Sequence, residues 1–294
     1  MMTQFSVILG CPRSGTTFLV RALQPLARTE ALTGLVYPPA LAHLAAVPPS
    51  HEVGALLDYS LAGALEDFVD FAARSRSWAL GAACSGNAGW LELLTVMRGR
   101  RRPLDAMIFK EPFLAFAPEF AYRALPEARI VHIHRDGRDC ADSLERKYAV
   151  LTDEKLASLS SNEAPMGRKV DHRYVPWWVD QAAEADFLAR SPFVRSVWMW
   201  REIAQRCEEF FARPDVVDSG RVLTVGYEQL MDDPIAVGHR VVAHIGLRPN
   251  RRVDRRLKTA HARSVGIHRR RRADEVAEAT ELARPELARL GYAT

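Results

Sequence analysis

The sequence is poor in cysteine and has no long hydrophobic run. Its four cysteines, Cys11, Cys84, Cys140 and Cys207, lie far apart and form neither a CxxC pair nor a cluster with the spacing of metal ligands. This pattern indicates reduced thiols rather than a disulfide framework. No run of about 18 apolar residues is present to span a bilayer, and the apolar stretch at 5–10 is too short for the core of a secretory signal. We therefore expect a soluble, cytoplasmic protein.

Neither the composition nor the charge is extreme. Hydrophobic residues make up 48% and charged residues 26% of the 294 residues, which excludes the disordered and fibrous classes. The net charge of +4 favours an anionic small molecule as a ligand. A nucleic-acid partner is not expected, because such proteins usually carry a larger and more localised basic excess.

Short buried strands alternate with helical segments along the chain. Strands are predicted at 5–10, 105–110 (DAMIFK), 128–135 (ARIVHIHR) and 221–227 (RVLTVGY). Helices are predicted from Thr16 until Pro25, from near Arg138, and from Pro234 to about His244. This alternation is typical of an α/β fold, a three-layer sandwich around a mainly parallel sheet. We expect residues 1–294 to form a single domain.

Two segments interrupt this alternation. Residues 151–195 are polar and then aromatic without strand periodicity, as in a lid or a binding loop. We predict an irregular insertion there, and a second irregular stretch at 38–60, which contains YPP and VPPS. The tail at 274–292 is predicted to be helical, with an interruption at Pro285.

The loop after the first strand lacks the lysine that nucleotide triphosphatases carry there. Gly10 and Gly15 have the spacing of G-x-x-x-x-G-K-[ST], but Thr16 occupies the lysine position and the charge has moved to Arg13. The N–H groups at the start of the next helix still form an anion site. No acidic strand end is evident to hold magnesium. The loop therefore suits a shorter anionic group without a metal, unless it is only a glycine turn with an exposed arginine.

The segment CPRSGTTF resembles the 5′-phosphosulfate loop of sulfotransferases that use 3′-phosphoadenosine 5′-phosphosulfate (PAPS), whose pattern is Pro-[Lys/Arg]-Ser-Gly-Thr-Thr. The resemblance implies a P-loop sulfotransferase fold and PAPS as the co-substrate, with no metal. It assigns the donor contacts of this loop to Pro12, Arg13, Ser14, Gly15, Thr16 and Thr17. Phe18 stands where relatives often place a tryptophan that stacks on adenine, and core packing is the equal alternative.

A second phosphate-binding pattern follows the 128–135 strand. Arg135 ends the strand and Ser143 follows eight positions later. This spacing resembles the family's 3′-phosphate motif, and a guanidinium with a hydroxyl suits a phosphate dianion. A capped polar turn is the alternative. Farther along, VLTVGYEQLMDDP resembles the family stretch whose tyrosine, here Tyr227, contacts the adenine side of the donor.

The donor loop near the C-terminus resembles the family less. SVGIHRRRR keeps Gly266 and abundant charge, but not the usual Arg-x-Gly-x-x-Gly-x-x-Lys pattern. Arg269 and Arg270 are candidates to close over the 3′-phosphate, and a solvated basic face is the alternative.

Sulfonate transfer needs in-line geometry, cations near the leaving oxygen, and a base for the acceptor hydroxyl. By resemblance, Arg13 and Lys110 are the candidate catalytic cations. Cytosolic relatives place a histidine two residues after that lysine, but this chain has Pro112. Glu111 is our first candidate for the base, followed by Glu30 and His134.

The acceptor side is less defined. Trp177 and Trp178 of YVPWWVD are predicted to line an acceptor pocket, unless they belong to the core. The predicted reaction is sulfonate transfer to a hydroxyl of a small molecule, lipid or saccharide. Two alternatives stay open at this point: a metal-dependent small-molecule kinase, and a nucleic-acid or acidic-partner binding module built around HRRRR.

Overall fold

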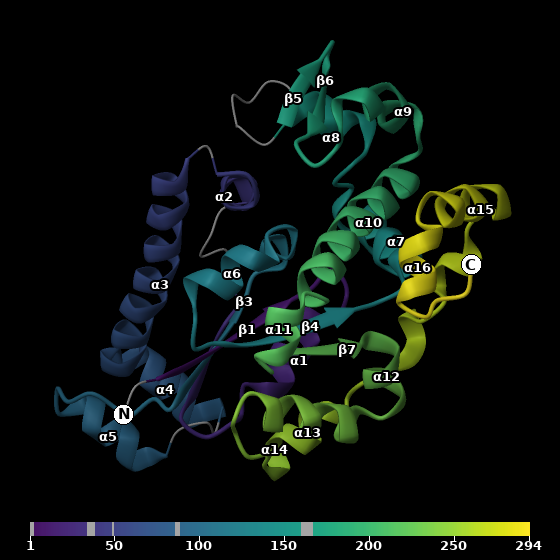
Figure 1. Cartoon of the computed structure of the whole chain (residues 1–294). Helices are drawn as coiled ribbons and strands as arrows, with labels where there is room; N and C mark the ends of the chain where they lie inside the picture. Colours follow the sequence, from purple (N-terminus) through teal and green to yellow (C-terminus); the bar gives the residue numbers. More distant parts are fainter. Residues whose placement is uncertain (1–2, 34–38, 49, 86–88, 160–166) are drawn as a thin grey trace.

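A five-stranded parallel sheet forms the centre of the molecule (Figure 1). The computed structural model describes residues 3–33, 39–48, 50–85, 89–159 and 167–294. The strands of this sheet are β1 (Gln4–Leu9), β2 (Thr29–Leu32), β3 (Ala106–Lys110), β4 (Arg129–His134) and β7 (Val222–Gly226). Their order in the sheet is β2-β3-β1-β4-β7. After β1, the chain adds β2 and β3 on one side of this strand and then β4 and β7 on the other, so the direction of the strand order reverses between β1 and β4. Ligands of open α/β sheets bind at such a reversal, beside the carboxyl ends of the strands.

Alternate residues of each strand pack into two separate cores. Val7 and Leu9 of β1 belong to one hydrophobic cluster, and Ile8 between them belongs to the other. Strand β3 repeats this pattern with Phe109 on the first side and Ile108 on the second. Because successive side chains of a strand point to opposite faces, both faces of the sheet are covered. The predicted three-layer α/β sandwich is confirmed.

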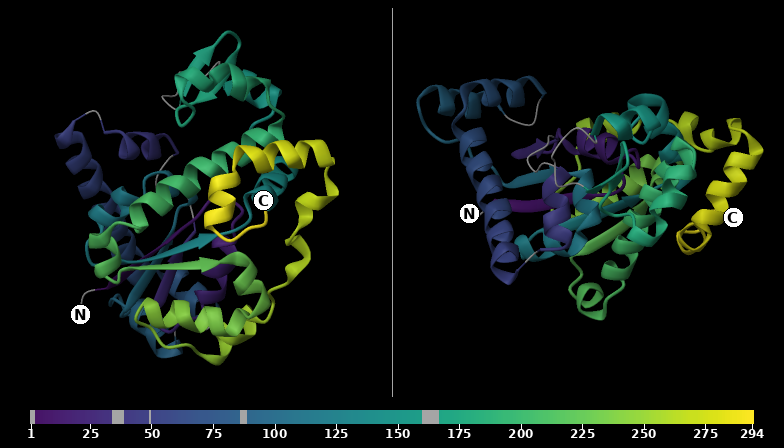
Figure 2. Two further views of the ribbon diagram at one scale, coloured as in Figure 1. Left: turned by 45° about the vertical axis from the view of Figure 1, so that its right-hand side comes forward. Right: turned by 90° about the horizontal axis from the view of Figure 1, so that it is seen from above.

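Helices on both faces complete the sandwich (Figures 1 and 2). One cluster joins the sheet to α1 (Thr16–Leu23), α12 (Tyr227–Asp232), α13 (Pro234–His244) and α14 (Arg251–Leu257). The other joins it to α3 (His51–Arg74), α6 (Pro118–Ala124), α7 (Gly137–Tyr148), α10 (Pro192–Phe211), α15 (Ala273–Leu282) and α16 (Arg284–Arg289). The remaining α-helices are α2 (Pro39–Ala46), α4 (Arg76–Ser85), α5 (Trp90–Met97), α8 (Asp153–Leu159), α9 (Glu184–Ala189) and α11 (Pro214–Asp218).

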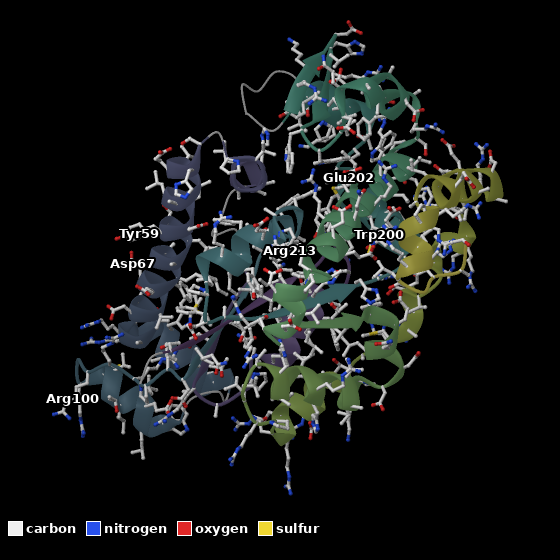
Figure 3. The ribbon with its side chains drawn as sticks, viewed as in Figure 1. Tyr59, Asp67, Arg100, Trp200, Glu202 and Arg213 are labelled. Carbon is white, nitrogen blue, oxygen red and sulfur yellow. The ribbon has the colours of Figure 1, made fainter. Side chains whose placement is uncertain are left out.

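Helix α10 fixes the position of α7. Trp200 of α10, labelled in Figure 3, is buried directly against Gly137 at the start of α7. A Cβ atom at residue 137 would lie 2.2 Å from the Trp200 ring, so glycine is required for this close approach. Asp136 caps the helix, since its Oδ1 accepts a hydrogen bond from the N–H of Arg138. These contacts set the helix that carries Ser143.

Both segments predicted to be irregular contain helices or strands in the part of the chain that the structure describes, which leaves out residues 160–166. Residues 151–195 contain α8, a two-stranded antiparallel sheet of β5 (Gly167–Val170) and β6 (Arg173–Pro176), α9 and the start of α10. Within 38–60 the structure has α2 and the start of α3, while residues 38 and 49 lie outside the described part of the chain. Most of these elements are short, and α10 begins at a proline, so no long periodic pattern marked them; α3 is long, but only its residues 51–60 fall in the stretch predicted to be irregular.

Strand β2 was also missed, because its four residues, TEAL, show no alternation. The tail behaves as predicted: α15 ends at Leu282, and Pro285 lies in the first turn of α16. Within the described residues, no helix is long and apolar enough to cross a membrane. The cytoplasmic location and the single-domain organisation stay predictions.

Candidate active site

The glycine loop after β1 closes tightly over the end of β4. Gly10 has φ +156°, and a Cβ atom there would lie 2.3 Å from the carbonyl oxygen of Ile133. Gly15 begins α1 with φ +99°, and a Cβ atom there would lie 2.4 Å from the ring of Tyr227. Glycine is thus required at both ends of the loop, once for backbone contact and once for a left-handed conformation beside an aromatic ring.

Arg13 joins the two predicted phosphate motifs. Its backbone lies in the left-handed region, with φ +76°. Its Nε donates a 2.9 Å hydrogen bond to Ser143 Oγ, and its carbonyl oxygen accepts a 3.1 Å bond from Arg135 Nη1. Residues that are 122 and 130 positions from Arg13 in the chain therefore meet at one point. The parallel pairing of β1 with β4 explains this meeting, because the carboxyl ends of both strands lie at the same edge.

A cavity of about 720 Å³, which we call the basic cavity, opens at this edge. The loop and α1 contribute Arg13, Thr16, Thr17, Phe18 and Arg21 to its wall. The turn after β4, α7 and α12 contribute Arg135, Ser143, Lys147, Tyr148 and Tyr227. Arg256, Thr259, His261 and Ser264 close the far side. Among the described residues that line it, none is an aspartate or a glutamate. The cavity therefore favours a ligand with several negative charges.

Arg135 is buried against this cavity and is held from several sides. Its guanidinium lies 4.5 Å from the centre of the Tyr227 ring and donates a hydrogen bond to the carbonyl oxygen of Ser264. The Tyr227 hydroxyl in turn lies 3.1 Å from Ser264 Oγ. Two buried polar atoms in this region have no hydrogen-bond partner among the described residues: Arg135 Nε and Ser14 Oγ. Arg135 lines the basic cavity, and an unpaired buried donor there is ready to bind a ligand, since leaving it unpaired is costly. Ser14 is fully buried and lines neither this cavity nor the one that adjoins it.

Asp139 ties the C-terminal segment to α7. Its carboxylate accepts hydrogen bonds from the backbone N–H of Gly266 (2.7 Å) and of His268 (3.1 Å), and it forms an ion pair with Arg135 (3.5 Å). Because these contacts hold Gly266 and His268 inward, the residues that follow point outward. Arg269 and Arg270 are exposed and do not line the basic cavity. The structure does not bring these two predicted donor-binding residues to the site.

A second cavity of about 660 Å³, which we call the apolar cavity, adjoins the first. The two share Arg13, Thr16, Thr17 and Tyr148 in their walls. Lys110, at the end of β3, lines the apolar cavity, and its Nζ donates a 3.3 Å hydrogen bond to Thr17 Oγ1. Burial lowers the pKa of Lys110, and the charges of Arg13 and Arg21 act in the same direction. The predicted catalytic cations therefore lie where the two cavities meet.

Trp177 and Trp178 lie in the wall of the apolar cavity, just after β6. Trp178 is also part of the hydrophobic core, and Trp177 is half-buried against it. The two tryptophans therefore line the cavity and also pack in or against the core.

The family model described as the sulfotransferase family matches residues 7–188 of this chain. The chain belongs to the sulfotransferase family. The match spans both phosphate motifs, Lys110 and the two tryptophans, whereas Tyr227 and the C-terminal segment lie beyond it. No curated protein matches the sequence.

Solved structures that this chain resembles include two sulfotransferases and a retinol dehydratase. STF9 from Mycobacterium avium is 14% identical, with a TM-score of 0.49 over 100% of this chain and 78% of its own. A sulfotransferase from Alicyclobacillus acidocaldarius is 18% identical, with a TM-score of 0.46 over 99% and 94%. A retinol dehydratase in a complex with retinol and PAP is 12% identical, with a TM-score of 0.36 over 98% and 82%. The family assignment rests on the family model.

The three candidate bases of this sulfotransferase lie in different surroundings. Glu111 is buried beside Lys110, and its Oε1 accepts a 3.2 Å hydrogen bond from the N–H of Phe113. Burial raises the pKa of Glu111 to about 7, although the Phe113 N–H and the charge of Lys110 oppose the rise. Its side chain does not line either cavity, while its neighbours Lys110 and Pro112 do line the apolar one.

Glu30 and His134 lie away from both cavities. Glu30 is on β2, paired with the fully buried Arg102 and hydrogen-bonded to Trp78 Nε1 at 2.7 Å. His134 Nδ1 lies 2.8 Å from the hydroxyl of Tyr292, and burial lowers the pKa of His134 to about 4. Both side chains are engaged in contacts away from the two cavities, whereas Glu111 directly follows Lys110, one of the predicted cations.

Sequence reasoning missed part of the basic wall. Arg21 follows Thr17 by four residues on α1, and Lys147 follows Ser143 by four residues on α7. Because residues four apart share a helix face, this spacing could have indicated that Arg21 and Lys147 lie on the same faces as Thr17 and Ser143. Arg256 and Ser264 carried no such signal. Arg256 belongs to α14, which packs against α1, whereas Ser264 lies in the segment after α14 and is hydrogen-bonded to Arg135 and Tyr227.

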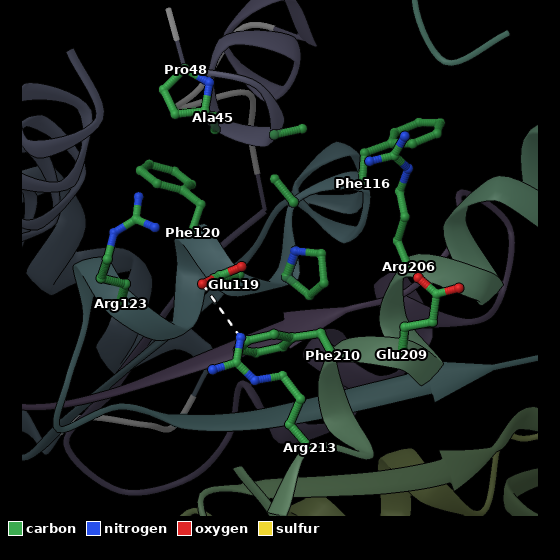
Figure 4. Close-up of a pocket in the computed structure, with 13 residues that line it drawn as sticks. Ala45, Pro48, Phe116, Glu119, Phe120, Arg123, Arg206, Glu209, Phe210 and Arg213 are labelled. Carbon is green, nitrogen blue, oxygen red and sulfur yellow. Dashed lines mark ion pairs between the residues drawn. The ribbon is translucent and has the colours of Figure 1, made fainter. Parts of the chain in front are cut away.

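A third cavity, which we call the outer cavity, lies beside the apolar one and shares Phe116 with it (Figure 4). Charged side chains line it, and several are already paired. Figure 4 shows the ion pair between Arg213 and Glu119, at 3.5 Å. Arg123, also in this wall, donates hydrogen bonds from Nε and Nη2 to the two carboxylate oxygens of Asp58.

Proposed function

We propose that this sulfotransferase moves the sulfonate group of PAPS to a hydroxyl of its acceptor. One observation carries the proposal: Arg13 and Arg135, from two motifs far apart in the chain, line the same cavity and are hydrogen-bonded to each other. PAPS has a phosphosulfate at one end and a 3′-phosphate at the other, and two cationic sites facing one cavity suit both.

The residues present fit this donor. The loop N–H groups, Ser14 and Thr16 would hold the 5′ side at the start of α1, where an anion is favoured. Arg135 and Ser143 would hold the 3′-phosphate, since the unpaired Arg135 Nε and the Ser143 hydroxyl supply donors. Tyr227 and Phe18 line the same cavity and supply aromatic surface for the adenine.

The transfer forms a bond between the acceptor oxygen and sulfur as the bond from sulfur to the bridging oxygen breaks. Arg13 and Lys110 stabilise the charge that develops on the leaving and equatorial oxygens. Glu111 accepts the hydroxyl proton. Because its side chain does not line the cavity, this role requires one intervening water molecule.

Donor recognition is tested first by ligand-dependent melting. Adenosine 3′,5′-bisphosphate (PAP) should raise the melting temperature much more than AMP, because only PAP carries the 3′-phosphate; at about 100 times its Kd the gain is about 2.7 kcal/mol. Ser143→Ala should reduce the shift given by PAP and leave that of AMP unchanged. Ser60→Ala, an exposed serine on α3, is the matched control. Equal shifts by PAP and AMP in the wild type would contradict the proposed 3′-phosphate site.

A second test uses the shape of the loop. Gly15→Ala should weaken PAP binding by at least about tenfold, because the new methyl group collides with Tyr227 at a left-handed position. Gly63→Ala is the matched control, since a methyl group there meets nothing within 4 Å on the surface of α3. This control should keep PAP binding and raise stability by about 0.5–1 kcal/mol. Unchanged PAP binding in Gly15→Ala, measured by calorimetry, would argue against donor binding at this loop.

A further inference from the structure

The wall of the apolar cavity separates polar from apolar groups. Most of its polar side chains gather at the end shared with the basic cavity: Arg13, Thr16, Thr17, Tyr148 and Lys110. Lys155 and Tyr174 also line the apolar cavity and do not line the basic one. The rest of the wall is mainly aromatic and aliphatic, with Phe113, Phe116, Leu156, Trp177, Trp178 and Met199. Among the described residues that line this cavity, no carboxylate and no amide side chain is present.

The aromatic part of the wall is held in place before any ligand arrives. The Trp177 ring stacks on His43 at 4.7 Å and 12°, and it contacts Phe116 at 5.5 Å. The Arg206 guanidinium lies 5.3 Å from the same ring, and Figure 4 shows Arg206 and Phe116 among the residues that line the outer cavity. Trp178 is stacked on Phe116 at 6.0 Å and meets Phe187 edge-on at 5.5 Å. A wall fixed in this way binds an apolar ligand without an ordering cost.

We propose that the acceptor is a largely apolar alcohol or phenol with its reacting hydroxyl at one end, rather than a saccharide. This inference rests on the proposed function. The hydroxyl end lies against Lys110 and Arg13, where the sulfonate is transferred, and the apolar body fills the cavity beyond. A saccharide would leave several hydroxyls facing aromatic rings, and each unpaired polar group costs about 1–3 kcal/mol.

The volume agrees with this assignment. About 660 Å³ is the size that encloses a drug-sized molecule, much larger than phenol itself. Lengthening an apolar acceptor should therefore improve it until the cavity is full. Each buried CH₂ contributes about 0.8 kcal/mol, which corresponds to about a fourfold gain in kcat/KM.

The experiment is an acceptor series with PAPS, with the sulfated product measured by mass spectrometry. The acceptors are phenol, para-ethylphenol, para-butylphenol and para-octylphenol, with D-glucose and N-acetylglucosamine as the polar set. We expect kcat/KM to rise with alkyl length by about three- to fourfold per CH₂ at first, and to be lowest for the sugars. A flat series, or a preference for a sugar, would overturn the inference.

Trp177→Ala tests the wall directly. It should raise KM for para-octylphenol by about tenfold and leave KM for phenol nearly unchanged, because only the longer molecule reaches the ring. Trp90→Ala is the matched control, since Trp90 of α5 is 67% exposed and lines none of the cavities described above. Trp177→Phe, which keeps an aromatic ring, should retain most of the affinity for para-octylphenol. An equal effect of Trp177→Ala on both phenols would count against the proposal.

The melting shift given by PAP distinguishes a failure of the acceptor assignment from a failure of the donor assignment. If PAP stabilises the protein but no alkylphenol is sulfated better than a sugar, the acceptor assignment fails and the donor assignment stands. If PAP gives no stabilisation, the proposed function itself fails.

Discussion

Glu111→Gln is expected to lower turnover by a factor on the order of 10² to 10⁴, because it removes the carboxylate proposed to accept the hydroxyl proton. Only the ionised form acts as a base, and burial raises the pKa of Glu111 to about 7. The kcat of the wild type should therefore rise with pH between about 6 and 8 and then level off. The variant should lose this dependence. Glu127→Gln, at an exposed position, is the matched control.

Stability measurements separate this catalytic role from damage to the fold. The pKa of Glu111 is raised from 4.5 to about 7 in the folded state, so between these values the folded protein binds more protons than the unfolded chain. Its contribution to stability is therefore lost as pH rises through this range. Glutamine carries no charge and can still accept the hydrogen bond from Phe113, so Glu111→Gln should unfold at a higher temperature than the wild type at pH 8. The difference should shrink toward pH 5.

A near-normal rate in Glu111→Gln would remove Glu111 from the mechanism. The same conclusion would follow if the rate fell but the pH profile kept its wild-type shape. PAP binding must be intact in the variant, since the carboxylate lies outside the basic cavity.

The sequence allowed the fold class and the donor-side motifs to be predicted because both depend on local patterns. The strands at β1, β3, β4 and β7 are short buried runs, and the loop between Gly10 and Gly15 has the glycine spacing of a phosphate-binding loop. The order of the strands in the sheet could not be predicted from these local patterns. Once β1 and β4 are neighbours, Arg13 and Arg135 must approach each other, and the structure shows this as a hydrogen bond.

Contacts between distant segments were beyond the sequence. Nothing local indicated that Asp139 would fix Gly266 and His268, and this contact turns Arg269 and Arg270 toward solvent. Glu30 was a candidate base, yet it forms an ion pair with Arg102, a buried arginine 72 positions later in the chain. The direction of the Glu111 side chain depends on the turn that follows β3, where Phe113 N–H binds it.

Lys110→Met is expected to lower kcat by about 10²- to 10³-fold, because it removes a cation from the point where the two cavities meet. Burial lowers the pKa of Lys110, which indicates that few water molecules shield its charge. PAP binding should change little, since Lys110 does not line the basic cavity. Lys169→Met, an exposed lysine on β5 outside both cavities, is the matched control.

The pH profile distinguishes the roles of the two neighbours at the end of β3. Lys110→Met should lower the rate at every pH and keep the dependence that Glu111 produces, shifted to higher pH because the lysine charge lowers the pKa of that carboxyl. Combining it with Glu111→Gln should give a loss smaller than the product of the single losses if both residues act in one step. A Lys110→Met variant with normal kcat and a raised KM would instead make Lys110 an acceptor-binding residue, because transition-state stabilisation must appear in kcat.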